Sequence, residues 1–311
     1  MPEGPELLYM AEFINNAQER VGPFVDVSMS ALATHPTKHP RVTVPFSPFS
    51  LQARSRGKEL IITIKPAPAA AAPSSKRKKQ TQAAVDDAAG SSLEVLVRAG
   101  MSGNFLLLEP GEEMPKHAHL RFHSPSGHVL YFQDVRRFGC WRPGGAWGLD
   151  DDTRGPCIIQ ELDDVVQKIQ LHLPSRAFAR PICELMMNQS FFNGMGNYLR
   201  AEILHRAKIH PFSQARAVLM DAVKRQHDGR PGFFSVCEQV LAESVALLRK
   251  HGFADDEERT RVFEEWLQCY MKLNKGKDAL GRTIWFGSGL RKARAMAADA
   301  VAVVKLMQWR W

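Results

Sequence analysis

The sequence predicts an α+β protein of two domains, an N-terminal β-sandwich with flanking helices followed by a helical domain. Two stretches of the 311 residues support this expectation. Short apolar runs separated by glycine- and proline-containing turns fill residues 42–143, a pattern typical of an antiparallel sandwich or barrel. After about Gly155 the apolar residues recur at helical spacing instead.

The first expected element is an amphipathic helix over residues 5–20. Gly22 and Pro23 end its pattern. Its apolar face would consist of Leu7, Met10, Ala11, Ile14 and Ala17. Such a helix would hold the amino terminus in place.

The predicted strands are five short runs, interrupted once by a segment of different composition. They are residues 60–64, 93–97, 105–108, 119–122 and 129–132. Residues 66–92 have almost no large apolar side chains and cannot offset the entropy of ordering, so we expect a disordered loop between two strands. The KRKK cluster at residues 76–79 fits a nuclear-localisation signal and a solvated charge run equally well.

The second half of the chain is expected to be mainly helical. Residues 181–187 begin with proline in the first helical turn, residues 197–204 begin a second helix, and residues 235–250 form a third. Strand-like character returns in residues 266–286, around Tyr270 and around residues 283–286.

The composition limits the kinds of binding partner and the cellular compartment that we expect for this protein. Of the formal charge of +8, residues 66–92 supply only +2, so the rest is itself basic and favours nucleic acid over an anionic membrane surface. Five cysteines without a C-x-x-C pair argue against a disulfide framework and exclude a sequence-local zinc ribbon. We find neither a secretory signal pattern nor an apolar run that could span a membrane, and expect a soluble protein in a reducing compartment.

Pro2 is a candidate nucleophile. Removal of Met1 would leave a secondary amine beside Glu3 and Glu6, and α-amino groups titrate near pH 7.7 to 8.0 in model peptides. The amine could attack an electrophilic carbon while a carboxylate moves protons, as in Schiff-base catalysis. The alternative is an ordinary helix start, with Pro5 in the first turn and Glu6 complementing the helix dipole.

Residues 188–198 form a second candidate site. Gly194 and Gly196 permit positive φ and close backbone approach between two helices. Free amides at the start of the second helix, with the Asn197 side chain, would cradle an anion such as a phosphate. An isolated Gly-x-Gly is more often an ordinary turn, but the long composite string disfavours that interpretation here.

Six short strings occur along nearly the whole chain. They are MPEGPE at the start, RGKE at 56–59, GMSG at 100–103, DVRRFG at 134–139, FFNGMGNYLRAEIL at 191–204 and GRTIWF at 281–286. Together, and in this order, they resemble the formamidopyrimidine-DNA glycosylase and endonuclease VIII family. The opening MPEGPE resembles the endonuclease VIII branch, and the missing four-cysteine zinc finger is similar to the animal Nei-like 1 type.

The resemblance implies a role for each catalytic candidate. Pro2 would attack C1′ of the damaged nucleotide and form an iminium. Glu3 would protonate the sugar ring oxygen, and Glu6 would support it. Lys58 would contact the phosphate beside the lesion and aid strand scission; standing alone, it would be a solvated strand-end lysine.

The resemblance also implies DNA-binding residues. Met101, Arg136 and Phe138 would fill the void left by the flipped nucleotide, with Arg137 beside them. The alternative for Met101 and Phe138 is core packing. Phosphates would be gripped by Asn197 and Arg282. The lesion-capping loop departs from the family pattern at residues 248–253, where Lys250 or His251 would contact the lesion.

The implied organisation is a catalytic β-sandwich at 2–150, a helix-two-turns-helix domain at 153–262, a zincless β-hairpin finger at 263–290 and a tail at 291–311, with DNA in the cleft between the domains. The implied function is excision of oxidised bases, chiefly pyrimidines, followed by β,δ-elimination. We expect no metal or cofactor, no membrane partner, a monomer, and a nuclear location, with cytoplasm or an organelle open. Two alternatives are a catalytically silent binder of damaged DNA and an N-terminal-proline tautomerase.

Overall fold

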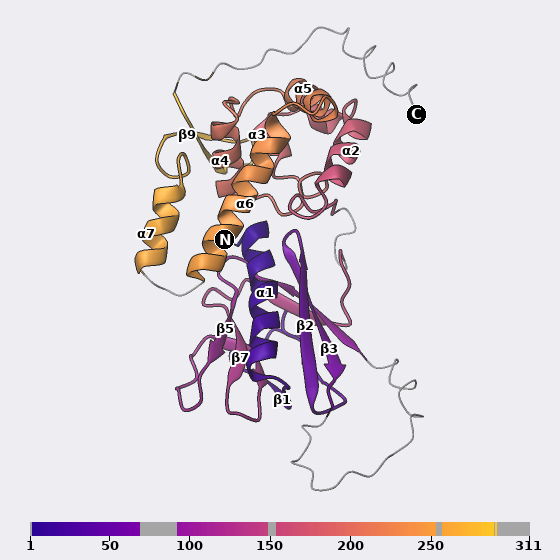
Figure 1. Cartoon of the computed structure of the whole chain (residues 1–311), viewed down its shortest axis with the longest axis vertical. Helices are drawn as coiled ribbons and strands as arrows, with labels where there is room; N and C mark the ends of the chain where they lie inside the picture. Colours follow the sequence, from indigo (N-terminus) through magenta and orange to yellow (C-terminus); the bar gives the residue numbers. More distant parts are fainter. Residues whose placement is uncertain (1, 69–91, 149–153, 253–256, 289, 291–311) are drawn as a thin grey trace. The chain divides into compact units, whose positions relative to one another are not determined.

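The computed structural model describes residues 2–68, 92–148, 154–252, 257–288 and 290 and forms two compact units (Figure 1). The first unit comprises Met1–Pro2 and Glu6–Asp152, and the second comprises Glu3–Pro5 and Thr153–Trp311. Strands dominate the first and helices the second, which confirms the α+β prediction.

Two four-stranded antiparallel sheets build the first unit (Figure 1). One has the order β1 (Asp26–Met29), β6 (Ala118–His123), β7 (Val129–Gln133), β5 (Asn104–Leu108). The other has the order β2 (Phe49–Arg56), β3 (Glu59–Pro66), β4 (Leu93–Arg98), β8 (Cys140–Pro143). All five predicted runs lie in strands, whereas the prediction named none of β1, β2 and β8.

Helix α1 (Gly4–Val21) confirms the first predicted element and covers the outer edge of β2 (Figure 1). Its predicted apolar face is buried. The Asn15 side chain donates to the carbonyl of Ala53 at 2.9 Å and accepts from the Ala53 amide at 2.7 Å. Gln18 Oε1 accepts from the Leu51 amide at 2.7 Å. These side chains pair main-chain groups that an edge strand would otherwise leave open.

The predicted insertion joins neighbouring strands of one sheet. β3 ends at Pro66, β4 begins at Leu93, and Ile64 pairs with Leu93. The KRKK cluster at residues 76–79 and the tail at 291–311 lie outside the described residues.

The second unit packs its helices around one apolar core. Its elements are α2 (Leu162–His172), a 3-10 turn (Arg176–Ala179), α3 (Ile182–Leu185), α4 (Asn197–Arg206), α5 (Ala215–His227), α6 (Phe233–His251), α7 (Glu257–Trp266) and the hairpin β9 (Asn274–Lys277) and β10 (Thr283–Phe286). The helices predicted at 197–204 and 235–250 are confirmed. The one predicted at 181–187 is shorter, because turn hydrogen bonds from Met187 and Asn188 replace the helical ladder. No described helix has the length and apolar character to span a bilayer.

Strand-like structure around Tyr270 was predicted wrongly. The strand before β10 begins four residues later, at Asn274, and Tyr270 lies in a turn. The Glu202 carboxylate explains why no strand forms there. Glu202 accepts the amides of Gln268 at 2.9 Å and of Cys269 and Tyr270 at 2.8 Å each, so these amides face a side chain instead of a partner strand.

Candidate functional site

Glu3 is fixed at the start of helix α4. Its carboxylate is 2% exposed and accepts the main-chain amides of Tyr198 at 3.0 Å and Leu199 at 3.3 Å. The amides of the first helical turn have no partner within the helix, and the helix dipole favours negative charge there. Gly4 adds a main-chain bond to the Gly194 carbonyl at 2.8 Å. The backbone from which Pro2 extends is therefore anchored.

This geometry corrects one expectation. The amides at the start of α4 were predicted to be free for a phosphate, but two of them already bind the Glu3 carboxylate. The anion at the helix start is therefore a side chain of the protein itself, Glu3. The Asn197 side chain remains a candidate for phosphate, because its Nδ2 group can donate hydrogen bonds to an anion. Its buried Oδ1 has no hydrogen-bond partner among the described residues.

The two glycines before α4 have different tasks. Gly194 has φ of 104°, a left-handed conformation that favours glycine. Gly196 has φ of −137°, which any residue adopts, but a Cβ there would lie 2.0 Å from the Glu3 carboxyl carbon. Gly196 therefore leaves the space into which the Glu3 carboxylate fits.

Arg282, the predicted phosphate contact of the hairpin, is held by Asp278. The Arg282 amide donates to Asp278 Oδ1 at 2.9 Å, and Arg282 Nε lies 3.3 Å from Oδ2. Burial raises the pKa of the Asp278 carboxyl, but hydrogen bonds from Arg200 and Arg282 and the charges of both guanidinium groups outweigh it and lower the pKa. Asp278 is thus a carboxylate that orients the hairpin turn.

Arg200 connects this carboxylate to helix α4. Its side chain is fully buried and donates to Asp278 Oδ2 at 2.9 Å, to the Cys183 carbonyl at 2.9 Å and to the Thr283 carbonyl at 3.2 Å. Glu202, on the same helix, binds the amides of residues 268–270. Helix α4 therefore binds the Glu3 carboxylate at its start and, through Arg200 and Glu202, fixes the base of the hairpin that contains Arg282.

Lys58 lies in the tight turn between β2 and β3. Arg56 pairs with Glu59 across this turn, and Gly57 has φ of 59°. Glu59 is 2% exposed and binds Arg98 at 2.6 Å and the Gly148 amide at 3.2 Å. The RGKE string therefore forms a hairpin with a two-residue turn, in which Lys58 is partly exposed and the following Glu59 is buried and paired.

Met101 and Phe138 are surface residues. Met101 is 40% exposed and Phe138 is 51% exposed, so the alternative that these side chains pack in the core is wrong for both. Arg136 and Arg137 are also exposed, and the Arg136 guanidinium lies 5.1 Å from the centre of the Phe138 ring. Exposed apolar side chains beside a guanidinium suit insertion into a base stack.

The remaining predicted residues are less informative. Glu6 lies in the first turn of α1 and is partly buried. Lys250 and His251 end helix α6, and residues 253–256, in which the lesion loop would continue, lie outside the described residues. Across the described ranges, no three His, Cys, Asp or Glu side chains gather as a metal site requires. Cys183 and Cys269 are buried thiols whose pKa burial raises to about 12.

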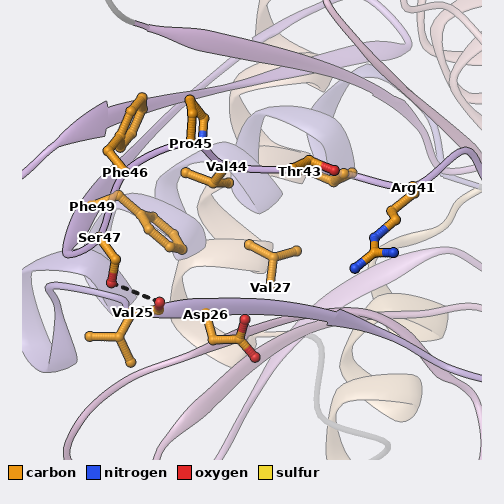
Figure 2. Close-up of a pocket in the computed structure, with 11 residues that line it drawn as sticks. Val25, Asp26, Val27, Arg41, Thr43, Val44, Pro45, Phe46, Ser47 and Phe49 are labelled. Carbon is orange, nitrogen blue, oxygen red and sulfur yellow. Dashed lines mark hydrogen bonds between the residues drawn. The ribbon is translucent and has the colours of Figure 1, made fainter.

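A pocket of about 290 Å³ lies apart from all predicted residues (Figure 2). It is formed by β1 and the segment 41–49, and Val27, Val44 and Phe49 line it. Ser47 donates to the Val25 carbonyl at 2.9 Å at one side. No predicted catalytic or DNA-binding residue lines this pocket.

Comparison with known proteins identifies the family. The profile of the formamidopyrimidine-DNA glycosylase N-terminal domain matches residues 1–141, and that of the endonuclease VIII-like 1 DNA-binding domain matches residues 261–289. Human endonuclease 8-like 1 is 38% identical over 306 residues, which cover 92% of this chain and 72% of the human protein. The chain belongs to the formamidopyrimidine-DNA glycosylase and endonuclease VIII family.

More distant family members agree with this assignment. The formamidopyrimidine-DNA glycosylase of Xanthomonas axonopodis pv. citri is 30% identical over 213 residues, covering 66% of this chain and 76% of that protein. The structure of MutM in complex with carbocyclic 8-oxo-G containing DNA shares the fold with a TM-score of 0.68 at 19% identity, covering 94% of this chain and 100% of the other. The tautomerase alternative is thereby ruled out.

Sequence reasoning missed the residues that hold the predicted ones in place. Arg200, Glu202 and Asp278 are all buried. One signal was available: Arg200 and Glu202 are charged positions within the otherwise apolar run of residues 198–204, and buried charges need partners. Nothing in the sequence marked Asp278 as the partner of Arg200.

Proposed function

We propose that this chain is a bifunctional DNA glycosylase and AP lyase of base excision repair that removes oxidised bases, chiefly pyrimidines. The similarity to endonuclease 8-like 1 over 92% of the chain carries the proposal. The anchored Glu3 carboxylate directly after Pro2 supports it, since the reaction needs an amine and a proton-transfer group side by side.

The chemistry begins at the Pro2 amine. After loss of Met1, its lone pair attacks C1′ of the damaged nucleotide, and the glycosidic bond breaks with its electrons going to the departing base. Glu3 protonates the ring oxygen, the sugar ring opens, and an iminium links the protein to C1′. Loss of a C2′ proton then breaks the 3′ C–O bond, and a second elimination breaks the 5′ C–O bond. Water then hydrolyses the remaining iminium, which frees the Pro2 amine and releases the sugar remnant as an unsaturated aldehyde. A one-nucleotide gap with phosphate ends results.

The proposal assigns DNA contacts to six of the predicted residues. Lys58, Asn197 and Arg282 bind phosphates around the flipped nucleotide, while Met101, Arg136 and Phe138 replace the lost stacking. The free energy of flipping is a few kcal/mol, and these contacts offset it. The basic excess outside residues 66–92 favours the same partner.

The cellular setting follows from the same proposal. The protein acts as a monomer in the nucleus, with the KRKK cluster at 76–79 as the candidate import signal. Replacing all four basic residues by glutamine in a fluorescent fusion tests this: nuclear exclusion supports the signal, and an unchanged distribution refutes it.

A cleavage assay tests the proposed reaction. A duplex with one 5-hydroxyuracil is incubated with the protein, and the strand ends are resolved beside matched markers. Excision with 3′- and 5′-phosphate ends, lost in Pro2→Gly, supports the proposal. Binding to the damaged duplex without base loss, on this and on other oxidised bases, would instead establish the silent binder.

A further inference from the structure

Met101 and the Arg136–Phe138 pair lie on two loops that cross side by side between the two sheets of the first unit. The first loop joins Arg98 of β4 to Asn104 of β5, and the second joins Gln133 of β7 to Cys140 of β8. Arg98 pairs with Cys140 in one sheet, and Asn104 pairs with Gln133 in the other. Both loops therefore start and end at the same two strand pairs. We call residues 99–103 and 134–139 the crossover loops.

Ser102 and Asp134 tie the crossover loops together. Ser102 Oγ donates to Asp134 Oδ1 at 2.5 Å and accepts the Arg136 amide at 3.1 Å. Asp134 Oδ2 accepts the Gly139 amide at 2.7 Å. A carboxylate that is 1% exposed thus holds the hydroxyl of one loop and the far end of the other. Hydrogen bonds to a charged acceptor are the stronger kind.

The backbones of the two loops are also in direct contact. Gly100 has φ of 63°, and a Cβ there would lie 2.5 Å from the Gly139 nitrogen and from the Phe138 carbonyl carbon. Two buried histidines hold the ends of the second loop: His119 Nε2 donates to the Asp134 carbonyl at 3.0 Å, and His39 Nε2 donates to the Gly139 carbonyl at 3.1 Å. Hydrogen bonds and direct backbone contact therefore support the exposed tips of both loops.

We propose that Ser102 and Asp134 are positioning residues that make the crossover loops one preorganised wedge, so that Met101, Arg136 and Phe138 enter the duplex together. This inference rests on the proposed function. Insertion of separately mobile loops would require ordering them at the moment of binding, which lowers affinity, whereas a preformed wedge avoids this loss. Arg136 already lies over the Phe138 ring in the free protein, as such preorganisation requires.

The test compares Ser102→Ala with Ser102→Thr, which keeps the hydroxyl. Both are assayed for cleavage at an abasic site in duplex and in single-stranded DNA, because a single strand has no stack to fill. We expect Ser102→Ala to lower kcat/KM on duplex by about tenfold, the effect of one lost hydrogen bond, and to leave single-strand cleavage within about twofold. Ser102→Thr restores the duplex rate.

Ser124→Ala is the matched control, because Ser124 donates to the Val21 carbonyl in the same unit and lies outside the crossover loops. It is expected to lower the melting temperature without a selective loss on duplex. An equal duplex loss in Ser124→Ala, or no duplex loss in Ser102→Ala, would overturn the proposal.

A binding measurement separates this inference from the proposed reaction. A fluorescent 2-aminopurine placed opposite a tetrahydrofuran site reports wedge insertion without any bond cleavage. Insertion that is slowed in Ser102→Ala and normal in Ser102→Thr supports the wedge even if the protein cleaves nothing. Equal insertion in all three proteins, or no insertion by the unmodified protein, would refute it.

Discussion

Glu3 and Tyr198 are 195 residues apart in the sequence, yet Glu3 Oε1 accepts the Tyr198 main-chain amide at 3.0 Å. The carboxylate proposed to move protons is thus itself the anion that caps helix α4. A group held by two amides keeps its orientation, which a proton donor needs in order to act at one sugar oxygen. The same helix, through Arg200 and Glu202, holds the hairpin of Arg282.

Glu3→Gln is expected to lower base excision by about 10²- to 10⁴-fold, the usual contribution of a general acid or base. The amide oxygen still accepts one main-chain N–H, but the NH2 group faces the other and loses that bond. The check is single-turnover excision beside affinity for a duplex with a stable abasic analogue. Near-normal affinity with slow excision is expected; rapid excision would remove Glu3 from the reaction.

Gly196→Ala is expected to act through Glu3. The new Cβ would lie 2.0 Å from the Glu3 carboxyl carbon, so the carboxylate must leave its place between the amides of Tyr198 and Leu199. A double-mutant cycle with Glu3→Ala measures this. Excision by Gly196→Ala should fall, and the double variant should be no worse than Glu3→Ala. Additive losses would mean that Gly196 acts by another route.

Asp278→Asn is expected to lower the free energy of unfolding by about 3–5 kcal/mol, because it leaves the buried Arg200 guanidinium without its carboxylate. The matched control is Asp221→Asn, which breaks the exposed Arg225 pair on α5 and should cost about 0.3–0.5 kcal/mol. Urea unfolding of both variants gives the comparison. Similar small losses would contradict the anchoring role of Asp278.

Stability is expected to fall below about pH 6.5 because of His39 and His119. Burial lowers the pKa of both in the folded protein. Above the unfolded value of about 6.5 both states are neutral, so their contribution is constant. Below it the unfolded chain takes up protons that the folded chain does not, so stability decreases until the folded pKa is reached.

Urea unfolding between pH 7.5 and 5 measures this effect. The double variant His39→Gln/His119→Gln keeps an N–H donor for the carbonyls of Gly139 and Asp134 and should show a shallower pH dependence. His123 and His205, whose pKa burial also lowers, would account for the remainder. An unchanged slope in the double variant would contradict the account.

Local patterns were sufficient for much of the fold. The apolar face of α1, the runs in β3 to β7 and the start of α4 were all readable because periodicity and turn residues are local signals. The error at Tyr270 has the opposite origin: the Glu202 carboxylate that binds its amide lies 68 residues earlier, and no local pattern reports such a pairing.

The residues of the candidate site also fall into those that a local sequence pattern reveals and those that it does not. Residues proposed to act on DNA, such as Pro2, Lys58 and Arg282, stand in recognisable strings. The residues that hold them, Asp278 among them, act through contacts that only the folded chain brings together. The crossover loops show this best, since Ser102 and Asp134 are 32 residues apart in the sequence and meet only in the folded chain.

Borohydride trapping on a duplex with one oxidised pyrimidine tests the central claim most directly, with the intact mass measured to establish loss of Met1. The account predicts a covalent adduct in which peptide mapping places the sugar on Pro2. An adduct on Lys58 or another lysine, or no adduct from a des-Met1 protein that binds this duplex, would contradict it.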